Sequence, residues 1–170
     1  LIERRVWLHG QQCGRRALLL DHTYGGQGFE QAWLTGTSVQ AKLAIYPGTQ
    51  SLRAIVLERM GTVAPPVWPN PVFDAEWQNI AGRFADNPWL PLQAMVLPAC
   101  TPFVRAEKPY ALVLGRQIDL LLPPSDIWAL LAYTGGHAVQ LMGEWDGRQL
   151  RPLSAWVVDQ PNTFWQGGAL

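Results

Sequence analysis

The clearest structural signal in the sequence is Val139-Gln-Leu-Met-Gly-Glu-Trp145, which Asp146-Gly147 joins to the stretch from Arg148 to Val158. Both flanking runs have the length of a strand, and Asp-Gly is one of the dipeptides that two-residue hairpin turns favour. This part of the chain therefore predicts an antiparallel β-hairpin.

Short strand-like runs recur through the rest of the chain. Between Val39 and Tyr46, apolar and polar residues alternate with the period of a strand that buries one face. Two hairpins in succession within the first sixty residues predict an antiparallel meander. Further strands are expected at residues 4–10, 16–22, 52–58, 93–97, 102–106, 110–114 and 117–122, with Gly115-Arg116 as the last turn.

Two segments have the pattern of helices. The first carries an apolar stripe with spacings of four, three and four residues, which lies on one face of a helix. The stripe consists of Phe73, Trp77, Ile80 and Phe84, after the capping pair Asn70-Pro71. A second helix is expected from Pro124 to Tyr133. The order of elements predicts an α+β fold of mostly antiparallel hairpins with two short-to-medium helices.

A proline-rich stretch at residues 60–71 separates the two halves of the chain. Because proline disrupts the interior of helices and strands, the stretch predicts a linker or a surface loop. A length of 170 residues is that of one domain, and each half alone is small. We therefore expect residues 1–170 to form a single domain with one shared core, subdivided near 60–71 into an N-terminal β meander and a C-terminal αβ part.

The composition excludes several classes of protein. Hydrophobic residues make up 48% of the chain and charged residues 15%, a balance that disordered chains, collagens and coiled coils do not have. The 13 basic and 13 acidic side chains cancel, which argues against a surface wholly devoted to nucleic acid. No apolar run is long enough to span a bilayer, so no membrane partner is expected. The chain starts without methionine or a signal-peptide pattern, and we expect a cytoplasmic fragment of a longer protein.

The chain offers few residues for a metal site. Cys13 and Cys100 are its only cysteines, too few for a disulfide framework or a cysteine-rich zinc site. Two free thiols are the simpler interpretation, with a bridge between them left open. His9, Cys13 and His22 lie on one predicted hairpin, but surface histidines and a small buried thiol explain them more simply. We expect no cofactor in this chain.

The densest glycine cluster is Gly25-Gly26-Gln27-Gly28, which follows a predicted strand. The backbone amides of such a loop can hold phosphate, provided that a helix begins directly after it. The cluster is therefore a candidate phosphate or ligand loop. The simpler interpretation is a turn with positive φ angles, because Gly36 soon interrupts the next segment and no lysine stands where a P-loop needs one.

Catalysis is weakly disfavoured. No serine lies in a Gly-x-Ser-x-Gly sequence. Asp21 and His22 are neighbours, but adjacent residues of a strand point to opposite faces. The sequence therefore offers no convincing set of catalytic groups.

Arginine and tryptophan suggest two kinds of binding surface. Four arginines at the ends of the first predicted hairpin could contact the phosphates of a nucleic acid, although solvated arginines are the simpler interpretation. These are Arg4, Arg5, Arg15 and Arg16. Trp7, Trp77 and Trp128 occupy positions compatible with a core. Other tryptophans lie near turns or prolines, where partial exposure favours a protein-binding surface. The candidates are Trp33, Trp68, Trp89 and Trp145.

Several segments together resemble the C-terminal region of bacterial SWIM zinc-finger family proteins. In the first half they are Arg5-Val-Trp-Leu-His-Gly10, Ala17-Leu-Leu-Leu-Asp21 with Gly25-Gly26-Gln27, and Ile45-Tyr-Pro-Gly48 with Leu52-Arg53-Ala54. In the second half they are Gly135-Gly136-His137, Gly143-Glu-Trp-Asp-Gly147 and Pro152-Leu-Ser-Ala-Trp156. The resemblance covers nearly the whole chain. It implies a cytoplasmic bacterial protein found with AAA+ ATPase and von Willebrand A-type partners, in a family assigned zinc binding and protein or DNA interaction.

The chain departs from this family at its name-giving motif. The C-x-C…C-x-H pattern is absent, so no zinc ligand can be assigned to any residue, and zinc is expected only in an upstream region. The sequence thus predicts a non-catalytic protein-interaction or assembly domain of a SWIM-type protein. The alternative is a nucleic-acid-binding module that uses the basic hairpin together with an upstream zinc finger.

Overall fold

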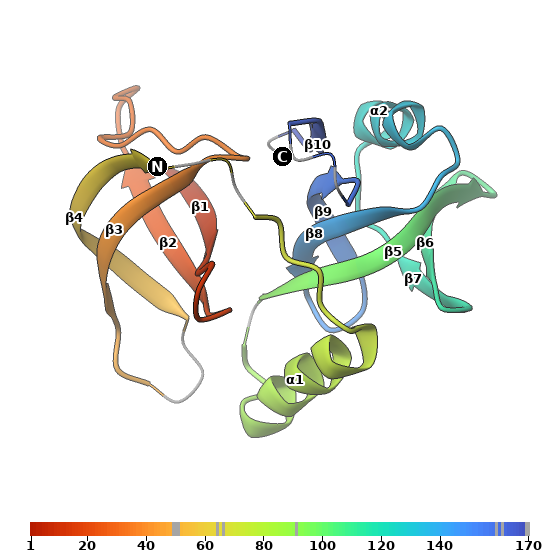
Figure 1. Cartoon of the computed structure of the whole chain (residues 1–170), viewed down its shortest axis with the longest axis horizontal. Coiled ribbons are helices and arrows are strands. Elements are labelled where there is room, and N and C mark those ends of the chain that lie inside the picture. Colours follow the sequence, from red (N-terminus) through yellow and green to blue (C-terminus); the bar gives the residue numbers. More distant parts are fainter. Residues whose placement is uncertain are drawn as a thin grey trace. The chain divides into compact units, whose positions relative to one another are not determined.

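The structure, a computed structural model, describes residues 1–48, 52–63, 65, 67–90, 92–158, 160 and 162–168, with the backbone alone at residues 62 and 63. These residues form ten strands and two helices in two mostly antiparallel sheets, which confirms the predicted α+β class (Figure 1). The chain divides into two compact units, Leu1–Pro69 (unit 1) and Asn70–Leu170 (unit 2). Their boundary falls within the predicted subdivision at 60–71. A core shared by both halves stays a prediction.

Unit 1 is a four-stranded sheet. Its strands are β1 (Ile2–His9), β2 (Arg16–Thr23), β3 (Ser38–Ile45) and β4 (Arg53–Val63). The first hairpin forms as expected, and Gly10 N–H closes its loop on the carbonyl of Arg15 at 2.8 Å. The predicted meander is wrong at the connection from β2 to β3. The strand order is β1-β2-β4-β3, and β2 pairs with β4 in parallel instead of with β3. The 14 residues between β2 and β3 are long enough to carry β3 past this position to the edge of the sheet.

Two irregularities curve unit 1. The pairing of β3 with β4 shifts between Val39 and Ala41 and again between Lys42 and Leu43. Such bulges bend a strand and increase its twist, and both strands curve strongly in Figure 1. β4 also runs to Val63, so the predicted linker begins later than expected; Ala64 and Pro66 lie outside the described residues.

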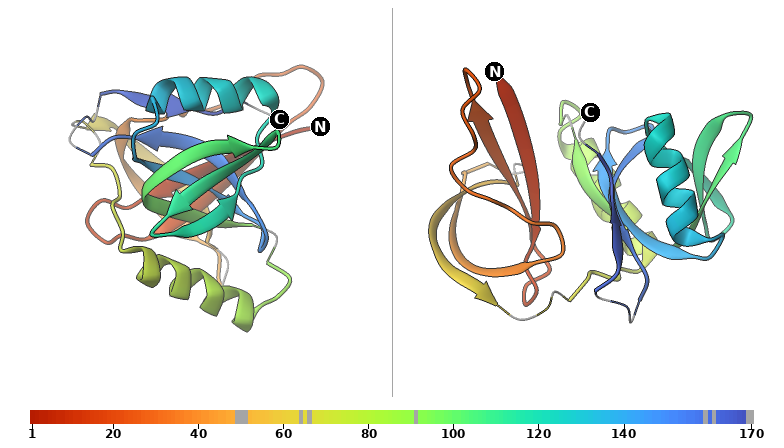
Figure 2. Two further views of the ribbon diagram at one scale, coloured as in Figure 1. Left: turned by 90° about the vertical axis from the view of Figure 1, so that its right-hand side faces the viewer. Right: turned by 90° about the horizontal axis from the view of Figure 1, so that it is seen from above.

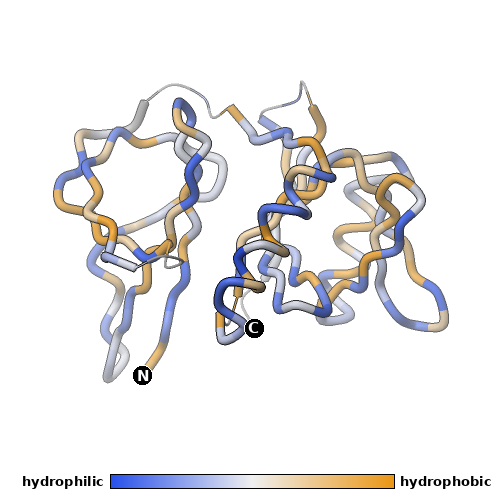
Figure 3. Tube along the Cα trace, turned by 90° about the horizontal axis from the view of Figure 1, so that it is seen from below, coloured by the Kyte–Doolittle hydropathy of each residue, from blue (hydrophilic) through white to orange (hydrophobic). Residues whose placement is uncertain are grey.

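Unit 2 contains a six-stranded sheet in the order β10-β9-β8-β5-β6-β7. Its strands are β5 (Gln93–Arg105), β6 (Lys108–Val113), β7 (Arg116–Asp119), β8 (Val139–Trp145), β9 (Leu150–Trp156) and β10 (Phe164–Gln166). The sheet is strongly curved. The backbone just beyond β7 therefore reaches β9, where Leu121 N–H donates to the carbonyl of Leu150 at 2.8 Å. Hydrophobic and hydrophilic stretches alternate along the strands of both units (Figure 3).

The two strands expected at 93–97 and 102–106 are one strand, β5. It pairs with β8 as far as Cys100 and with β6 from Thr101 onward. A register shift between Leu97 and Cys100 separates the two pairings, and there Ala99 has a φ of 36°. Pro98 lies in this shift, where its missing N–H interrupts no regular ladder. The prolines therefore mark a bend in a single strand.

Two turns differ in detail from the sequence prediction. Leu114 (φ 47°) and Gly115 (φ 77°), rather than Gly115-Arg116, join β6 to β7. The β8–β9 hairpin has four loop residues, in which Asp146 Oδ1 accepts hydrogen bonds from the backbone N–H groups of Arg148 and Gln149. Burial alone would raise the pKa of Asp146, but these hydrogen bonds outweigh it and lower that pKa from its ordinary value.

The helices α1 (Phe73–Asp86) and α2 (Pro124–Thr134) lie at opposite ends of the unit 2 sheet (Figures 1 and 2). The predicted stripe of α1 packs into the core, but the helix begins at Phe73, so Asn70-Pro71 do not cap it. α2 ends at Thr134 and is capped by Gly135, whose φ of 54° is left-handed, as expected for a helix-terminating glycine. Neither helix is long and apolar enough to cross a membrane.

A buried carboxylate joins α1 to β5. The edge of β5 opposite β8 has no strand neighbour before Thr101. The N–H of Val96 there donates to Glu76 Oε1 at 2.8 Å, and Glu76 is only 5% exposed. A charged acceptor makes a strong hydrogen bond with a backbone N–H, so Glu76 satisfies a group that the sheet leaves open.

We predict that Glu76→Ala lowers the free energy of unfolding by about 1.5–3 kcal/mol, because it leaves the buried Val96 N–H without this charged acceptor. Glu76→Gln keeps an acceptor oxygen and should lose less. Denaturant unfolding followed by far-ultraviolet circular dichroism measures both changes. Gln78→Ala, at an exposed position of the same helix, is the control. Equal stabilities for Glu76→Ala and Gln78→Ala would contradict the prediction.

Candidate binding surfaces

The four arginines predicted to contact nucleic acid do not form one patch. Arg4 lies opposite Asp21 in the first hairpin, and Arg16 lies opposite His9. Positions 4 and 9 of β1 are therefore about 17 Å apart along the strand. Arg4 and Arg5 also point to opposite faces of the sheet. The expected basic cluster is thus spread over both ends and both faces of the hairpin.

Carboxylates hold two of these arginines. Arg4 Nη2 lies 2.5 Å from Asp21 Oδ2, and its Nε lies 3.2 Å from the same oxygen. Arg5 Nη1 lies 3.2 Å from Glu3 Oε1, and the other oxygen of Glu3 lies 3.3 Å from His22 Nε2. An arginine whose charge is neutralised by a neighbouring carboxylate attracts phosphate less strongly.

The predicted ligand loop is a tight turn. Gly25 and Gly26 have φ angles of 61° and 78°, and Gln27 N–H donates to the carbonyl of Tyr24 at 3.1 Å. No helix follows in residues 28–37, so the condition for a phosphate site at Gly25-Gly26-Gln27-Gly28 is not met. The positive φ angles explain Gly25 and Gly26.

The four candidate tryptophans differ in exposure. Trp89 is 90% exposed in the turn after α1, whereas Trp33 and Trp68 are half-buried. Trp145 is 8% exposed and meets Trp77 edge-on at 5.5 Å between ring centroids, which removes it from the expected surface group. Trp128, expected in the core, is 65% exposed because it lies on the outer face of α2.

No candidate metal site assembles in the part of the chain that the structure describes. No three His, Cys, Asp or Glu side chains there could hold a metal ion. His9 lies opposite Arg16, whereas His22 lies opposite Glu3 at the other end of the hairpin, so the hypothetical site with Cys13 does not assemble. Cys13 is an exposed free thiol and Cys100 a buried one. Burial raises the pKa of Cys100 to about 12, which makes its thiol a poor nucleophile at neutral pH.

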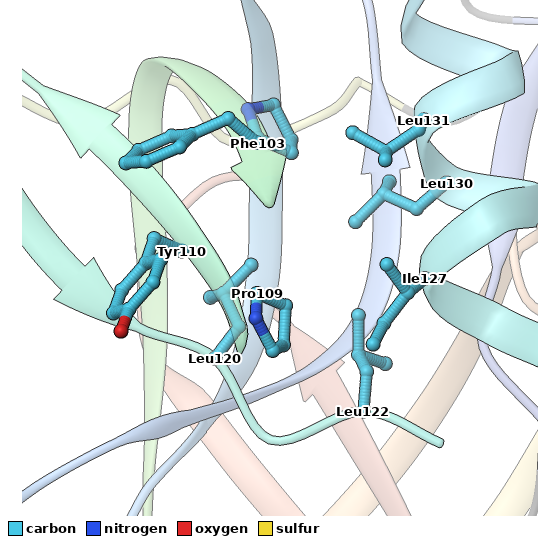
Figure 4. A pocket seen from close by; sticks show the side chains of 9 residues that line it. Phe103, Pro109, Tyr110, Leu120, Leu122, Ile127, Leu130 and Leu131 are labelled. Carbon is cyan, nitrogen blue, oxygen red and sulfur yellow. The ribbon is translucent and has the colours of Figure 1, made fainter. Parts of the chain in front are cut away.

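A shallow, open apolar depression lies within unit 2, between the β5–β6 hairpin and α2 (Figure 4). It holds about 160 Å³ of empty space, counting the part open to solvent. We call it the hairpin–helix groove. Apolar side chains line both of its walls, from the hairpin by Phe103, Pro109 and Tyr110, and from the helix by Ile127, Leu130 and Leu131.

The aromatic wall of the groove is held in place from outside. The rings of Phe103 and Tyr110, which are paired across the two strands, stack at 5.5 Å between centroids. Arg105 Cζ lies 5.3 Å from the centroid of Tyr110, and its Nη2 donates to Gln117 Oε1 at 2.7 Å. Side chains held in this way lose little conformational freedom when a ligand binds.

The sequence contained a signal for this groove that the prediction missed. Pro102-Phe103 and Pro109-Tyr110 are two proline–aromatic pairs on the arms of one short hairpin. The register of β5 and β6 sets the two rings side by side. Repetition of an unusual dipeptide across a hairpin therefore indicated a special surface, whereas abundance of tryptophan alone did not.

Compared with known proteins, the chain matches no family model, no curated protein and no solved structure. The resemblance to SWIM zinc-finger family proteins therefore stays a prediction.

We predict that only one of the two thiols reacts in the folded chain. With excess Ellman's reagent at neutral pH, Cys13 should react promptly while Cys100 stays protected by burial and by its raised pKa. Both thiols should react in denaturant. Cys13→Ser is the control and should show no prompt reaction. A second prompt thiol in the folded wild type would contradict the burial of Cys100.

Proposed function

We propose that this chain is a non-catalytic protein-interaction domain, and that unit 2 binds a short apolar segment of a protein partner in the hairpin–helix groove. The observation that carries the proposal is the groove itself, which is concave, apolar and lined by a stacked aromatic pair. Aromatic side chains that are rigid before binding are typical anchors of protein interfaces.

The size of the groove favours a peptide segment over a small-molecule cofactor. Sites for small molecules usually enclose about 300–1,000 Å³ and contain a few converging polar groups. The groove is far smaller than this, because its 160 Å³ includes space open to solvent, and the only polar side-chain atom among its lining residues is the hydroxyl of Tyr110. A partner segment would therefore lie against this shallow surface rather than insert side chains into an enclosed cavity.

Exposed apolar residues extend the groove along α2. Trp128 lies three residues before Leu131, and residues with this spacing are neighbours on a helix. Trp128 is 65% exposed, and Leu121, three residues before the helix, is 42% exposed. A partner segment that fills the groove could therefore bury further apolar area beside it.

The wider role rests on the sequence resemblance. Under that resemblance, the chain serves assembly with an AAA+ ATPase or a von Willebrand A-type protein, and zinc belongs to an upstream region. The nucleic-acid alternative has weaker support, because its four arginines are dispersed and two of them are paired with carboxylates.

The experiment is selection of displayed random peptides on the whole chain, followed by binding measurements with the selected peptides. We predict enrichment of peptides with apolar or aromatic anchors, and a loss of affinity of tenfold or more in Tyr110→Ala, as is typical of interface anchors. Trp128→Ala should weaken binding less, because its side chain lies beside the groove.

Trp89→Ala is the matched control, since it removes an exposed tryptophan from another part of unit 2. Circular dichroism should show the same fold for all three variants. Selected peptides that bind Tyr110→Ala as tightly as wild type, or no enrichment over an unrelated bait, would contradict the proposed site. Salt-sensitive binding of single-stranded oligonucleotides that Arg15→Glu abolishes would support the alternative instead.

A further inference from the structure

A long irregular segment of unit 1 passes over one end of its curved sheet (Figure 1). Residues 24–37, here called the strap, join β2 to β3 and contain no helix or strand. Loops of this length without secondary structure of their own are uncommon in compact domains and are often lids or binding loops. The length of the strap is therefore not explained by its role as a link between β2 and β3.

Two aromatic side chains anchor the strap. Phe29 and Trp33 are half-buried, and apart from Gly36 every other strap residue is exposed. Trp33 packs against the small apolar cluster of unit 1, whose buried members are Ala17, Leu19 and Ala54. The strap thus covers this cluster with little more than one side chain.

Each anchor lies under an arginine from the sheet. Arg4 of β1 places its Cζ 4.1 Å from the centroid of Phe29, and its Nη2 donates to the carbonyl of Gln31 at 2.7 Å. Arg59 of β4 repeats the arrangement 4.9 Å from the centroid of Trp33, and its Nη1 donates to the carbonyl of Ala32 at 2.8 Å. Two strands therefore hold the strap with the same pair of contacts.

These contacts are weak and depend on charge. A cation–π pair at an exposed site changes an equilibrium by a factor of about two to five. Asp21 orients Arg4 through an ion pair in which both side chains are partly exposed, and salt screens such pairs. Increased ionic strength should therefore loosen the strap more than the sheet.

The sheet beneath does not need the strap for its ladders. The β1–β2 and β3–β4 pairings run their full length between the strands themselves. Glycines with left-handed φ stand near both ends of the strap, at Gly25-Gly26 and at Gly36. Such positions can change conformation without the penalty that a side chain would bring.

We propose that the strap is a latch, which the Arg4 and Arg59 clamps hold over the apolar cluster of unit 1 and which opens as one piece while the four-stranded sheet stays folded. Opening removes Trp33 from the cluster and exposes its apolar floor. This device is independent of the hairpin–helix groove, which belongs to unit 2.

The test is amide hydrogen exchange of the whole chain, read by mass spectrometry on peptides that cover residues 24–37. Arg4→Met and Arg59→Met keep an apolar side chain but remove the charge, and each should speed exchange in the strap about two- to fivefold. Raising the salt from about 0.01 M to about 1 M should speed it in the wild type, because the Debye length falls from about 30 Å to about 3 Å. Arg15→Met, in the exposed hairpin loop, is the control and should change nothing.

Amide exchange in β1, β2 and β4 distinguishes opening of the strap alone from loosening of the whole unit 1 sheet. We expect these strands to keep their protection while the strap loses its own. Strap exchange that is unchanged in both variants and at both salt concentrations would overturn the proposal. It would also be overturned if the strands lost protection together with the strap, or if either variant unfolded, because the clamps would then belong to the fold itself.

Discussion

The bend in β5 is the constraint on which unit 2 depends. One strand of 13 residues pairs with β8 before the register shift at Leu97–Cys100 and with β6 after it. Both helices contact this strand, α1 near its start and α2 beside its second half. The second half also carries Phe103, which lines the hairpin side of the groove. The register shift falls where the pairing of β5 passes from β8 on one edge to β6 on the other, and it divides the strand into a half beside α1 and a half beside α2.

The two units differ in how their surfaces are held. Unit 2 has a core of many buried apolar side chains, to which every strand of its sheet and both helices contribute. Its groove therefore rests on rigid elements, which suits a site that binds with little rearrangement. In the described part of unit 1, the apolar cluster has three buried members, Ala17, Leu19 and Ala54. A surface segment there depends on polar and cation–π contacts, and this is where we expect local opening.

Local periodicity predicted most elements but not their long-range arrangement. The α1 stripe, the β8–β9 hairpin and the first hairpin were foreseen because their signals lie within a few residues. The parallel pairing of β2 with β4 and the union of two expected strands in β5 were not, since both depend on partners far away in the sequence. The same reason explains the site: exposure of Trp128 and burial of Trp145 follow from packing, and the groove exists only where a hairpin meets a helix.

The most direct test of the bend is the stability of Ala99→Gly. A left-handed φ costs a residue with a side chain about 1–2 kcal/mol, and glycine does not bear this cost. We predict that the substitution leaves the free energy of unfolding unchanged or raises it by up to about 1 kcal/mol, because Ala99 has a φ of 36°. A loss of about 0.5–1 kcal/mol, the usual cost of glycine inside a regular strand, would contradict the bend and with it the placement of the groove.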